Sequence, residues 1–228
     1  MPVHPRPYPV NLLLEGRPVL VVGGGTVALD KVRGLLAAGA EVTVVAPHVV
    51  DDLAALPVAV ERRPYERGDV EGYRLVVACT DDPAVNQAVH DDAEAHAIWV
   101  NAADDPERCT YTLPARLDRG PLLVTVSTAG RSPALAAWLR DQLAEAIGPE
   151  HEQLLDLLAE HRAALAAAGV RAPAASWRQA LDSGMLELIR DGRLTEARAL
   201  LDSVVGPAST GPGSREGAPT PCPSSSSD

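Results

Sequence analysis

The sequence contains no phenylalanine, and only 3% of its 228 residues are aromatic, although 46% are hydrophobic. Any buried core must therefore consist mainly of leucine, valine and alanine. Lysine is nearly absent too, since Lys31 is the only one and arginine carries the rest of the positive charge. The planar guanidinium group of arginine forms paired hydrogen bonds with carboxylates and phosphates. A codon bias toward arginine explains the same composition. The formal net charge of −11 argues against general nucleic-acid binding.

Cysteine is scarce, and its three positions, Cys79, Cys109 and Cys222, show neither C-x-x-C nor Cys/His spacing. Their odd number argues against a disulfide framework, and Cys109 reads as a small buried residue. The six histidines lack the spacing of metal ligands, so we expect no metal site. Prolines interrupt residues 1–10 where a secretory signal needs an apolar core, and no apolar run approaches the length of a membrane span. We expect a cytoplasmic protein in a reducing setting, with no membrane partner.

A short apolar run that ends at three glycines, VLVVGGGTVA, occupies residues 19–28. Gly23 and Gly25 permit a sharp turn and a close approach of the backbone to a pyrophosphate, while Ala28 lets the next helix pack on the strand. The N–H groups at the start of that helix are then available to the phosphates. Glycine triplets also form plain turns, but the order of strand, glycines, helix and strand favours nucleotide binding. The predicted cofactor contacts in this loop are Gly23, Gly24, Gly25, Thr26 and Val27.

Strands and helices alternate through the first half of the chain. We expect strands at residues 18–22, 41–46, 58–61, 75–78 and 98–101, and helices at residues 26–38 and 83–96. This alternation predicts an α/β fold with a Rossmann-like doubly wound parallel sheet, in a NAD-binding domain at residues 1–112. Ligands of such sheets lie beyond the carboxyl ends of the strands. We therefore look for site residues at 23–27, 79–82 and 101–105, with Thr80 as a predicted cofactor contact.

A different pattern follows Asp105. Residues 110–117 and 122–127 read as two strands of an antiparallel hairpin, because a turn signature, DRGP, separates them. Ser132-Pro133 then opens a helix. The apolar stripe of this helix consists of Leu135, Leu139, Leu143 and Ile147. The stripe either docks on the first domain or meets a second copy of the chain; we favour a homodimer, with residues 113–148 as the dimerisation region.

Leucine and alanine at helical spacing dominate residues 149–205, with breaks near residues 169–173, Gly184 and Gly192. Three or four short helices in a small helical domain are expected. Residues 206–228 are rich in Gly, Pro, Ser and Thr and offer little to bury, so we expect a disordered tail there.

The acidic residue that usually follows the second strand and binds the ribose 2′-hydroxyl is missing. That strand runs into Ala46-Pro47-His48, while Asp51 and Asp52 come later, where acidic residues commonly cap a short helix. No arginine follows the strand to receive a 2′-phosphate. We therefore expect NAD rather than NADP, with the backbone of Pro47 and His48 making the ribose contact.

The segment after the fifth strand carries the candidate chemistry. Asp104 is expected at the carboxyl edge near the nicotinamide, where a carboxylate can serve as a general base. Asp104 is equally well explained as a solvated acidic residue of a loop, next to Asp105. Asn101 either holds a ligand amide or caps the strand end. Ser127 and Thr128 either present hydroxyl groups to a substrate or shape the turn before the helix.

Six segments in the same order resemble the precorrin-2 dehydrogenases, which form the dehydrogenase–ferrochelatase part of sirohaem synthases. These segments are GGGTVA, TDDPAVN from Thr80, VNAADDP from Val100, LPA from Leu113, RGPL from Arg119 and STAGRSP from Ser127. The resemblance runs from about Tyr8 to Ile147, whereas the C-terminal helices match only in general character.

The resemblance implies oxidation of precorrin-2 to sirohydrochlorin with NAD⁺, and in many members insertion of Fe²⁺, as a substrate, to give sirohaem. It identifies Asp104 with the aspartate implicated in both activities, and it implies a homodimer. The methyltransferase domain fused to some members has no counterpart here, so we expect another protein to methylate uroporphyrinogen. Two alternatives stay open: a dehydrogenase without chelatase activity, and a NAD-sensing Rossmann dimer without chemistry, which gives Asp104 no role.

Precorrin-2 carries many carboxylates, so an acidic protein must bind it through local positive charge. Five arginines are candidate partners, with surface solubility as the alternative for each: Arg108, Arg116, Arg119, Arg131 and Arg140. We select Arg119 and Arg131 as substrate contacts, together with Ser127 and Thr128. Three residues depart from the family pattern. Tyr111 stands where phenylalanine is usual. Asp30 stands where an arginine commonly precedes the lysine, and Ala129 replaces a loop glycine, which requires a negative φ there.

Overall fold

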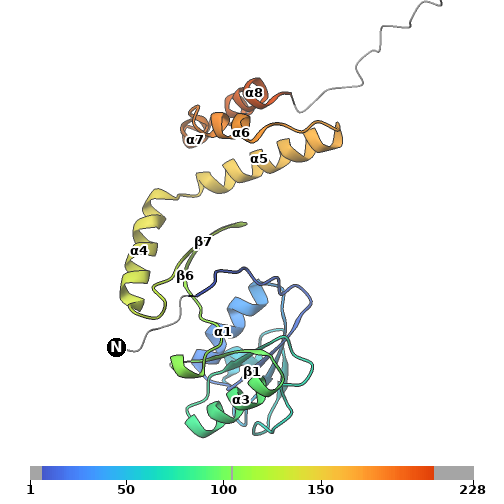
Figure 1. Ribbon diagram of the computed structural model, residues 1–228, viewed down its shortest axis with the longest axis vertical. Helices are drawn as coiled ribbons and strands as arrows, with labels where there is room; N and C mark the ends of the chain where they lie inside the picture. The colour runs from blue at the N-terminus through green and yellow to red at the C-terminus, as the bar shows by residue number, and fades with distance from the viewer. Residues whose placement is uncertain (1–6, 104, 208–228) are drawn as a thin grey trace, which may run out of the picture. The chain divides into compact units, whose positions relative to one another are not determined.

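The computed structural model describes residues 7–103 and 105–207. The chain divides into two compact units (Figure 1). The first consists of the residues up to Ala115 together with Val126–Ala137, and the second of Arg116–Thr125 together with the residues from Trp138 on. Each unit has a hydrophobic core of its own.

The first unit holds a five-stranded parallel sheet with the strand order β3-β2-β1-β4-β5. Its strands are β1 (Pro18–Val22), β2 (Glu41–Val45), β3 (Ala59–Glu61), β4 (Leu75–Ala78) and β5 (Trp99–Ala102), and its helices are α1 (Thr26–Ala37), α2 (Asp51–Ala54) and α3 (Pro83–Ala95). The strand order reverses between β1 and β4, so the carboxyl ends of these two strands mark the switch point where such sheets bind ligands. The predicted α/β fold with a doubly wound parallel sheet is confirmed.

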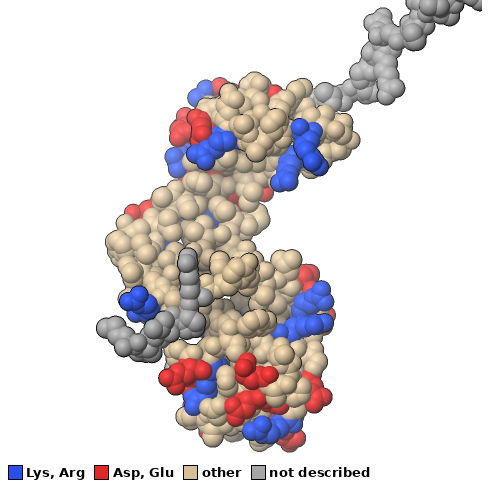
Figure 2. Space-filling view, viewed as in Figure 1, with Lys and Arg blue, Asp and Glu red and all other residues tan. Residues whose placement is uncertain are grey.

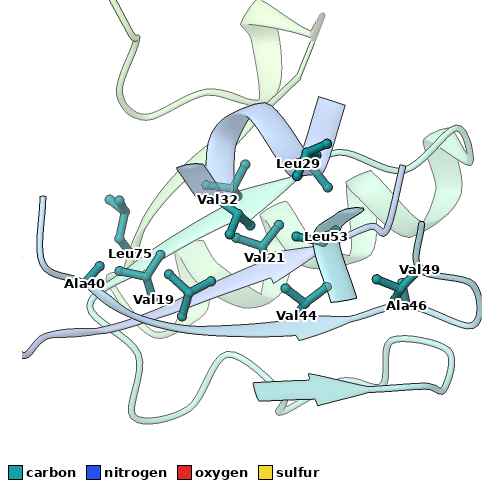
Figure 3. Close-up of a cluster of buried hydrophobic side chains, with 13 residues drawn as sticks. Val19, Val21, Leu29, Val32, Ala40, Val44, Ala46, Val49, Leu53 and Leu75 are labelled. Carbon is teal, nitrogen blue, oxygen red and sulfur yellow. The ribbon is translucent and has the colours of Figure 1, made fainter. Parts of the chain in front are cut away.

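Aliphatic side chains alternate between the two faces of this sheet. Val19 and Val21 of β1 join a buried cluster that α1 and α2 complete (Figure 3). The intervening Leu20 and Val22 join a second cluster, which α3 completes on the opposite face. Burial of one such side chain contributes roughly 1.5–3 kcal/mol. A sheet covered on both faces can therefore be stabilised without phenylalanine.

Between Ala115 and Pro207 the chain forms a hairpin and five helices. These are β6 (Ala115–Arg119), β7 (Leu122–Val126), α4 (Pro133–Ala146), α5 (Glu150–Ala167), α6 (Ala174–Leu181), α7 (Met185–Arg190) and α8 (Leu194–Val205). The last four helices share a core that includes Leu157, Met185 and Leu201, and α5, with 18 residues, is longer than expected. Across residues 7–103 and 105–207, no helix has both the length and the apolar character needed to cross a bilayer.

Two local predictions are wrong. The hairpin begins at Ala115 rather than at residue 110, because the Thr110 N–H donates instead to the Val100 carbonyl of β5 at 2.8 Å. Pro114 also lacks the N–H that a ladder requires. Ala129 has a φ of +53°, where a negative value was expected. The turn imposes this left-handed conformation, which costs an L-residue roughly 1–2 kcal/mol.

Candidate functional site

The glycine loop between β1 and α1 lies against the chain that follows β2. The Val50 N–H donates to the Gly24 carbonyl at 2.9 Å. A Cβ on Gly24 would overlap the carbonyl oxygen of His48, and a Cβ on Gly23 would lie 2.5 Å from the carbonyl oxygen of Cys79. The packing of the protein's own backbone therefore requires glycine at both positions.

Gly25 has a different environment, because it is exposed and no atom lies within 4 Å of an added Cβ. It is the N-cap of α1, where no side chain caps the helix and the first turn contains no acidic residue. Thr26 and Val27 in this turn are exposed. Uncapped N–H groups at the positive end of the helix dipole are thus accessible, and they fit a pyrophosphate. The exposed Pro47-His48 backbone follows β2 beside this loop, so the structure brings these predicted cofactor contacts together.

Thr80, just after β4, is held by the buried Asn86 of α3. The Thr80 hydroxyl donates to Asn86 Oδ1 at 2.8 Å, and Asn86 Nδ2 donates to the Thr80 carbonyl at 2.9 Å. Between them, Asp82 caps α3 by accepting from the Ala84 N–H at 2.8 Å. Sequence reasoning missed this clamp, although a Thr and an Asn that flank an Asp-Pro helix start are a usable signal for it. The Thr80 side chain shapes its own loop, and its contact with a cofactor stays a prediction.

Asn101 is buried at the carboxyl end of β5. Its Nδ2 donates to the Tyr111 carbonyl at 3.0 Å and lies 3.4 Å from the sulfur of Cys109. The amide nitrogen thus binds the chain that returns beside β5, and a contact with the cofactor stays a prediction. Asp104, the predicted catalytic residue, lies outside the described residues.

Three partly buried titratable groups lie near the carboxyl edge of the sheet. They are Cys79, Cys109 and Tyr111. Burial raises the pKa of Cys79 to about 12 and also raises the pKa values of Cys109 and Tyr111. Both thiols are therefore protonated near neutral pH and are poor nucleophiles. The positive charge of Lys31, in α1, lowers the pKa of each thiol and so offsets part of the effect of burial. In the described part of the chain, no group of three or more His, Cys, Asp or Glu side chains is arranged to hold a metal ion.

Hydroxyl groups close the turn that precedes α4. Thr128 Oγ1 accepts from the Ser132 N–H at 3.1 Å and donates to the Ser132 carbonyl at 3.0 Å. Ser127 Oγ accepts from the Ala129 N–H at 3.2 Å, and Ser132 Oγ caps α4 by accepting from the Leu135 N–H at 3.2 Å. Ser127 and Thr128 thus shape this turn, and their contact with a substrate stays a prediction.

The five candidate arginines differ in the groups that their guanidinium groups already bind. Arg119 reaches the end of α4, where Nε donates to the Ile147 carbonyl at 3.0 Å and Nη2 donates to the Ala144 carbonyl at 3.4 Å. Each of three others pairs with a nearby aspartate: Arg108 with Asp105, Arg116 with Asp118, and Arg140 with Asp141. Arg131 is exposed and has no side-chain partner within residues 7–103 and 105–207. Of the five, it is the most available to a ligand carboxylate.

Comparison with known proteins places these features in a family. Residues 10–115 match a family model described as "Putative NAD(P)-binding", and residues 119–146 match one described as "Sirohaem biosynthesis protein central". The Siroheme synthase of Methylococcus capsulatus is 40% identical over 199 residues, which are 85% of this chain and 42% of that protein. The Siroheme synthase of Azotobacter vinelandii is 38% identical, over 83% of this chain and 42% of its own length. The chain thus spans less than half the length of these curated relatives.

A solved structure, "SirC, precorrin-2 dehydrogenase", matches with a TM-score of 0.68 and 28% sequence identity, over 86% of this chain and 99% of that one. This match covers the parallel sheet and extends into the C-terminal helices, since the sheet unit alone is too short to account for it. The resemblance found in the motifs is therefore confirmed. The chain belongs to the sirohaem synthase family, of which it carries the NAD(P)-binding and central regions.

Proposed function

We propose that this chain oxidises precorrin-2 to sirohydrochlorin with NAD⁺ as the hydride acceptor. The observation that carries the proposal is the open position at Gly25 beside the uncapped start of α1, which forms a cradle for a dinucleotide. The N-x-x-D segment begins at Asn101, at the carboxyl edge of the same sheet. A solved structure that matches over 86% of this chain is named a precorrin-2 dehydrogenase, which supports this substrate.

In this proposal the three glycines shape the turn, and the N–H groups of Thr26 and Val27 bind the pyrophosphate. Bound NAD⁺ supplies the hydride acceptor. The backbone of Pro47 and His48 contacts the adenosine ribose, because β2 ends without an acidic side chain. We propose NAD rather than NADP, and titrations with NAD⁺ and NADP⁺ side by side test that preference.

The oxidation removes two hydrogens from the macrocycle. One leaves as a hydride to NAD⁺, and the other leaves as a proton to Asp104, the proposed general base, which yields sirohydrochlorin and NADH. Arg131, Ser127 and Thr128 are proposed to bind the peripheral groups of the substrate. Arg131 is the strongest candidate because its guanidinium is exposed, whereas the guanidinium of Arg119 is bound to the end of α4.

We further propose that the enzyme is a homodimer. Leu135 and Trp138 lie three residues apart on α4 and are 47% and 58% exposed. In Figure 2 the visible face over α4 shows few charged side chains. Grouped apolar side chains on a surface mark an interaction site, and two-fold pairing is the commonest form of self-association. Sedimentation velocity should show a dimer, and replacement of Trp138 by glutamate should weaken it; a wild-type monomer would contradict this proposal.

Insertion of Fe²⁺ into sirohydrochlorin is proposed as a second activity, with Asp104 assisting removal of the pyrrole protons. Its support is the family membership and the presence of the N-x-x-D segment. Iron enters this reaction as a substrate. The rival proposals are a dehydrogenase that lacks this second step and a NAD-sensing dimer that performs neither.

The deciding experiment incubates the purified chain with precorrin-2 and NAD⁺ in the absence of oxygen and follows absorbance. NADH and sirohydrochlorin should appear together, and an Asp104→Ala variant should be strongly impaired. No NADH formation would favour the NAD-sensing dimer. Addition of Fe²⁺ or Co²⁺ to the product then tests the second activity, and no metal insertion would leave only the dehydrogenase.

A further inference from the structure

The carboxyl ends of β1, β2 and β3 lie side by side in one row. The Gly23 N–H donates to the Val45 carbonyl at 3.0 Å, and the Ala46 N–H donates to the Glu61 carbonyl at 3.1 Å. In the parallel pairing of β2 with β3, Val45 stands opposite Glu61. Neighbouring strands lie about 4.8 Å apart. The residue after Glu61 is therefore one strand away from the segment that follows β2 and two strands away from the glycine loop.

Arg62 occupies this position at the end of β3. The Arg63 N–H donates to the Glu61 carbonyl at 3.0 Å, so Arg62 is the middle residue of a three-residue turn, a common feature of strand ends. The Arg62 side chain is exposed, and it makes no hydrogen bond or ion pair to any residue that the structure describes. Its guanidinium is therefore available to a ligand at the carboxyl edge of the sheet.

The neighbouring arginine, Arg63, binds the acidic groups that would otherwise compete for Arg62. Arg63 Nε donates to Glu61 Oε2 at 3.0 Å. Its two terminal nitrogens donate to the two carboxylate oxygens of Asp69, at 2.6 Å and 2.9 Å. Such a bidentate pair is among the stronger hydrogen-bonded arrangements in proteins, and it fixes the chain that leaves β3. Arg63 thus has a structural role, which leaves Arg62 as the free positive charge of this turn.

We propose that Arg62 binds the 2′-phosphate of NADP⁺, so that the cofactor site of this chain admits NADP⁺ beside NAD⁺. This inference rests on the proposed function, in which the exposed backbone of Pro47 and His48 contacts the adenosine ribose. In dinucleotide-binding sheets an arginine near that ribose accommodates a 2′-phosphate. The end of β2 carries no arginine, and the neighbouring strand supplies one. The planar guanidinium matches two phosphate oxygens at once.

NAD⁺ stays the preferred cofactor, because acidic side chains follow the same segment. Asp51 and Asp52 are exposed in the first turn of α2, shortly after His48. Their negative charges oppose the added phosphate, and Arg62 offsets them. Opposing charges at an exposed site nearly cancel, so the Kd for NADP⁺ should lie within about tenfold of the Kd for NAD⁺.

The test is calorimetric titration of the full chain with NAD⁺ and with NADP⁺, in the wild type and in two matched variants. Arg62→Ala should raise the Kd for NADP⁺ about tenfold, through loss of a charged hydrogen bond, and leave the Kd for NAD⁺ within about twofold. Arg74→Ala is the control, because Arg74 is also exposed but precedes β4 and so lies at the opposite, amino edge of the parallel sheet. It removes the same charge and should change neither Kd.

Three results would overturn the proposal. They are a wild-type Kd for NADP⁺ more than about tenfold above that for NAD⁺, an unchanged Kd for NADP⁺ in Arg62→Ala, and equal losses of NADP⁺ affinity in the two variants. The outcome is independent of catalysis. If the wild type binds both dinucleotides but forms no NADH from precorrin-2, the proposed function fails, and the two Kd values still decide the role of Arg62. If NADH forms while Arg62→Ala binds NADP⁺ as the wild type does, only the role of Arg62 fails.

Discussion

A methyl group added at Gly25 should weaken nucleotide binding and leave the free energy of unfolding nearly unchanged. The residue has φ −87° and ψ −168°, extended backbone that any residue adopts, and no atom lies within 4 Å of the added Cβ. Alanine is a poorer N-cap than glycine by up to about 1 kcal/mol. Because alanine also restricts the unfolded chain, which stabilises the fold by about 0.4–1 kcal/mol, the net change in the free energy of unfolding should be within about 0.5 kcal/mol.

The effect of Gly25→Ala on the cofactor should be larger, since the methyl group occupies the space through which a pyrophosphate approaches the first turn of α1. Loss of one hydrogen bond from a backbone N–H to a charged phosphate costs about 1.5–3 kcal/mol, or at least tenfold in Kd. Gly24→Ala is the matched opposite, because its methyl group meets the backbone of His48 and Val49, including Val49 Cα at 2.9 Å. Backbone atoms cannot move aside as a flexible side chain can, so this variant should lose about 1–3 kcal/mol of stability.

Calorimetric titration with NAD⁺ measures the effect on cofactor binding, and urea unfolding measures the effect on stability. Both are applied to the wild type, Gly25→Ala and Gly24→Ala. A Gly25→Ala variant that binds NAD⁺ within about twofold of the wild type would show that the open face of the loop is not the phosphate site. A Gly24→Ala variant as stable as the wild type would refute the packing argument.

Three further predictions concern charged side chains. Arg131→Ala should raise the KM for precorrin-2 several-fold without changing the melting temperature or the Kd for NAD⁺; an unchanged KM would remove Arg131 from the site. Arg119→Ala should lower the free energy of unfolding by about 1–3 kcal/mol, measured in urea, because it leaves carbonyl groups at the end of α4 without their donor. Burial opposes ionisation of Asp92, but hydrogen bonds from the Tyr65 hydroxyl and the Gly68 N–H outweigh it and hold the pKa of that carboxyl below its ordinary value. The stability from this carboxylate is therefore present above about pH 4 and lost as the pH falls through the lowered pKa, so Asp92→Asn should lose less stability than the wild type between about pH 6 and about pH 3 in urea unfolding.

The sheet could be predicted from the sequence because its strands are local patterns. β1 and β4 are unbroken apolar runs, buried on both faces, that end at glycines or at a polar cluster. The glycine loop was predictable for the same reason, since strand, turn and helix follow one another along the chain.

Side-chain roles at the edge of the sheet could not be predicted in this way, because the partners are distant in sequence. Asn101 binds the Tyr111 carbonyl ten residues away, and Arg119 binds the Ile147 carbonyl 28 residues away. A pattern places such residues at a strand end or in a turn, but it does not show whether their donors face a ligand or a backbone carbonyl. The positive φ of Ala129 was missed for a related reason, since its closed turn depends on the bonds between Thr128 and Ser132.

The proposed activity of this chain is the transfer of a hydride from precorrin-2 to NAD⁺. Its most direct test is the stoichiometry of that reaction, measured without oxygen as the NADH formed for each precorrin-2 consumed. One NADH should form for each sirohydrochlorin produced, at a rate that depends on the concentration of enzyme. Precorrin-2 that remains unchanged in the presence of a chain shown by calorimetry to bind NAD⁺ would contradict the proposed activity.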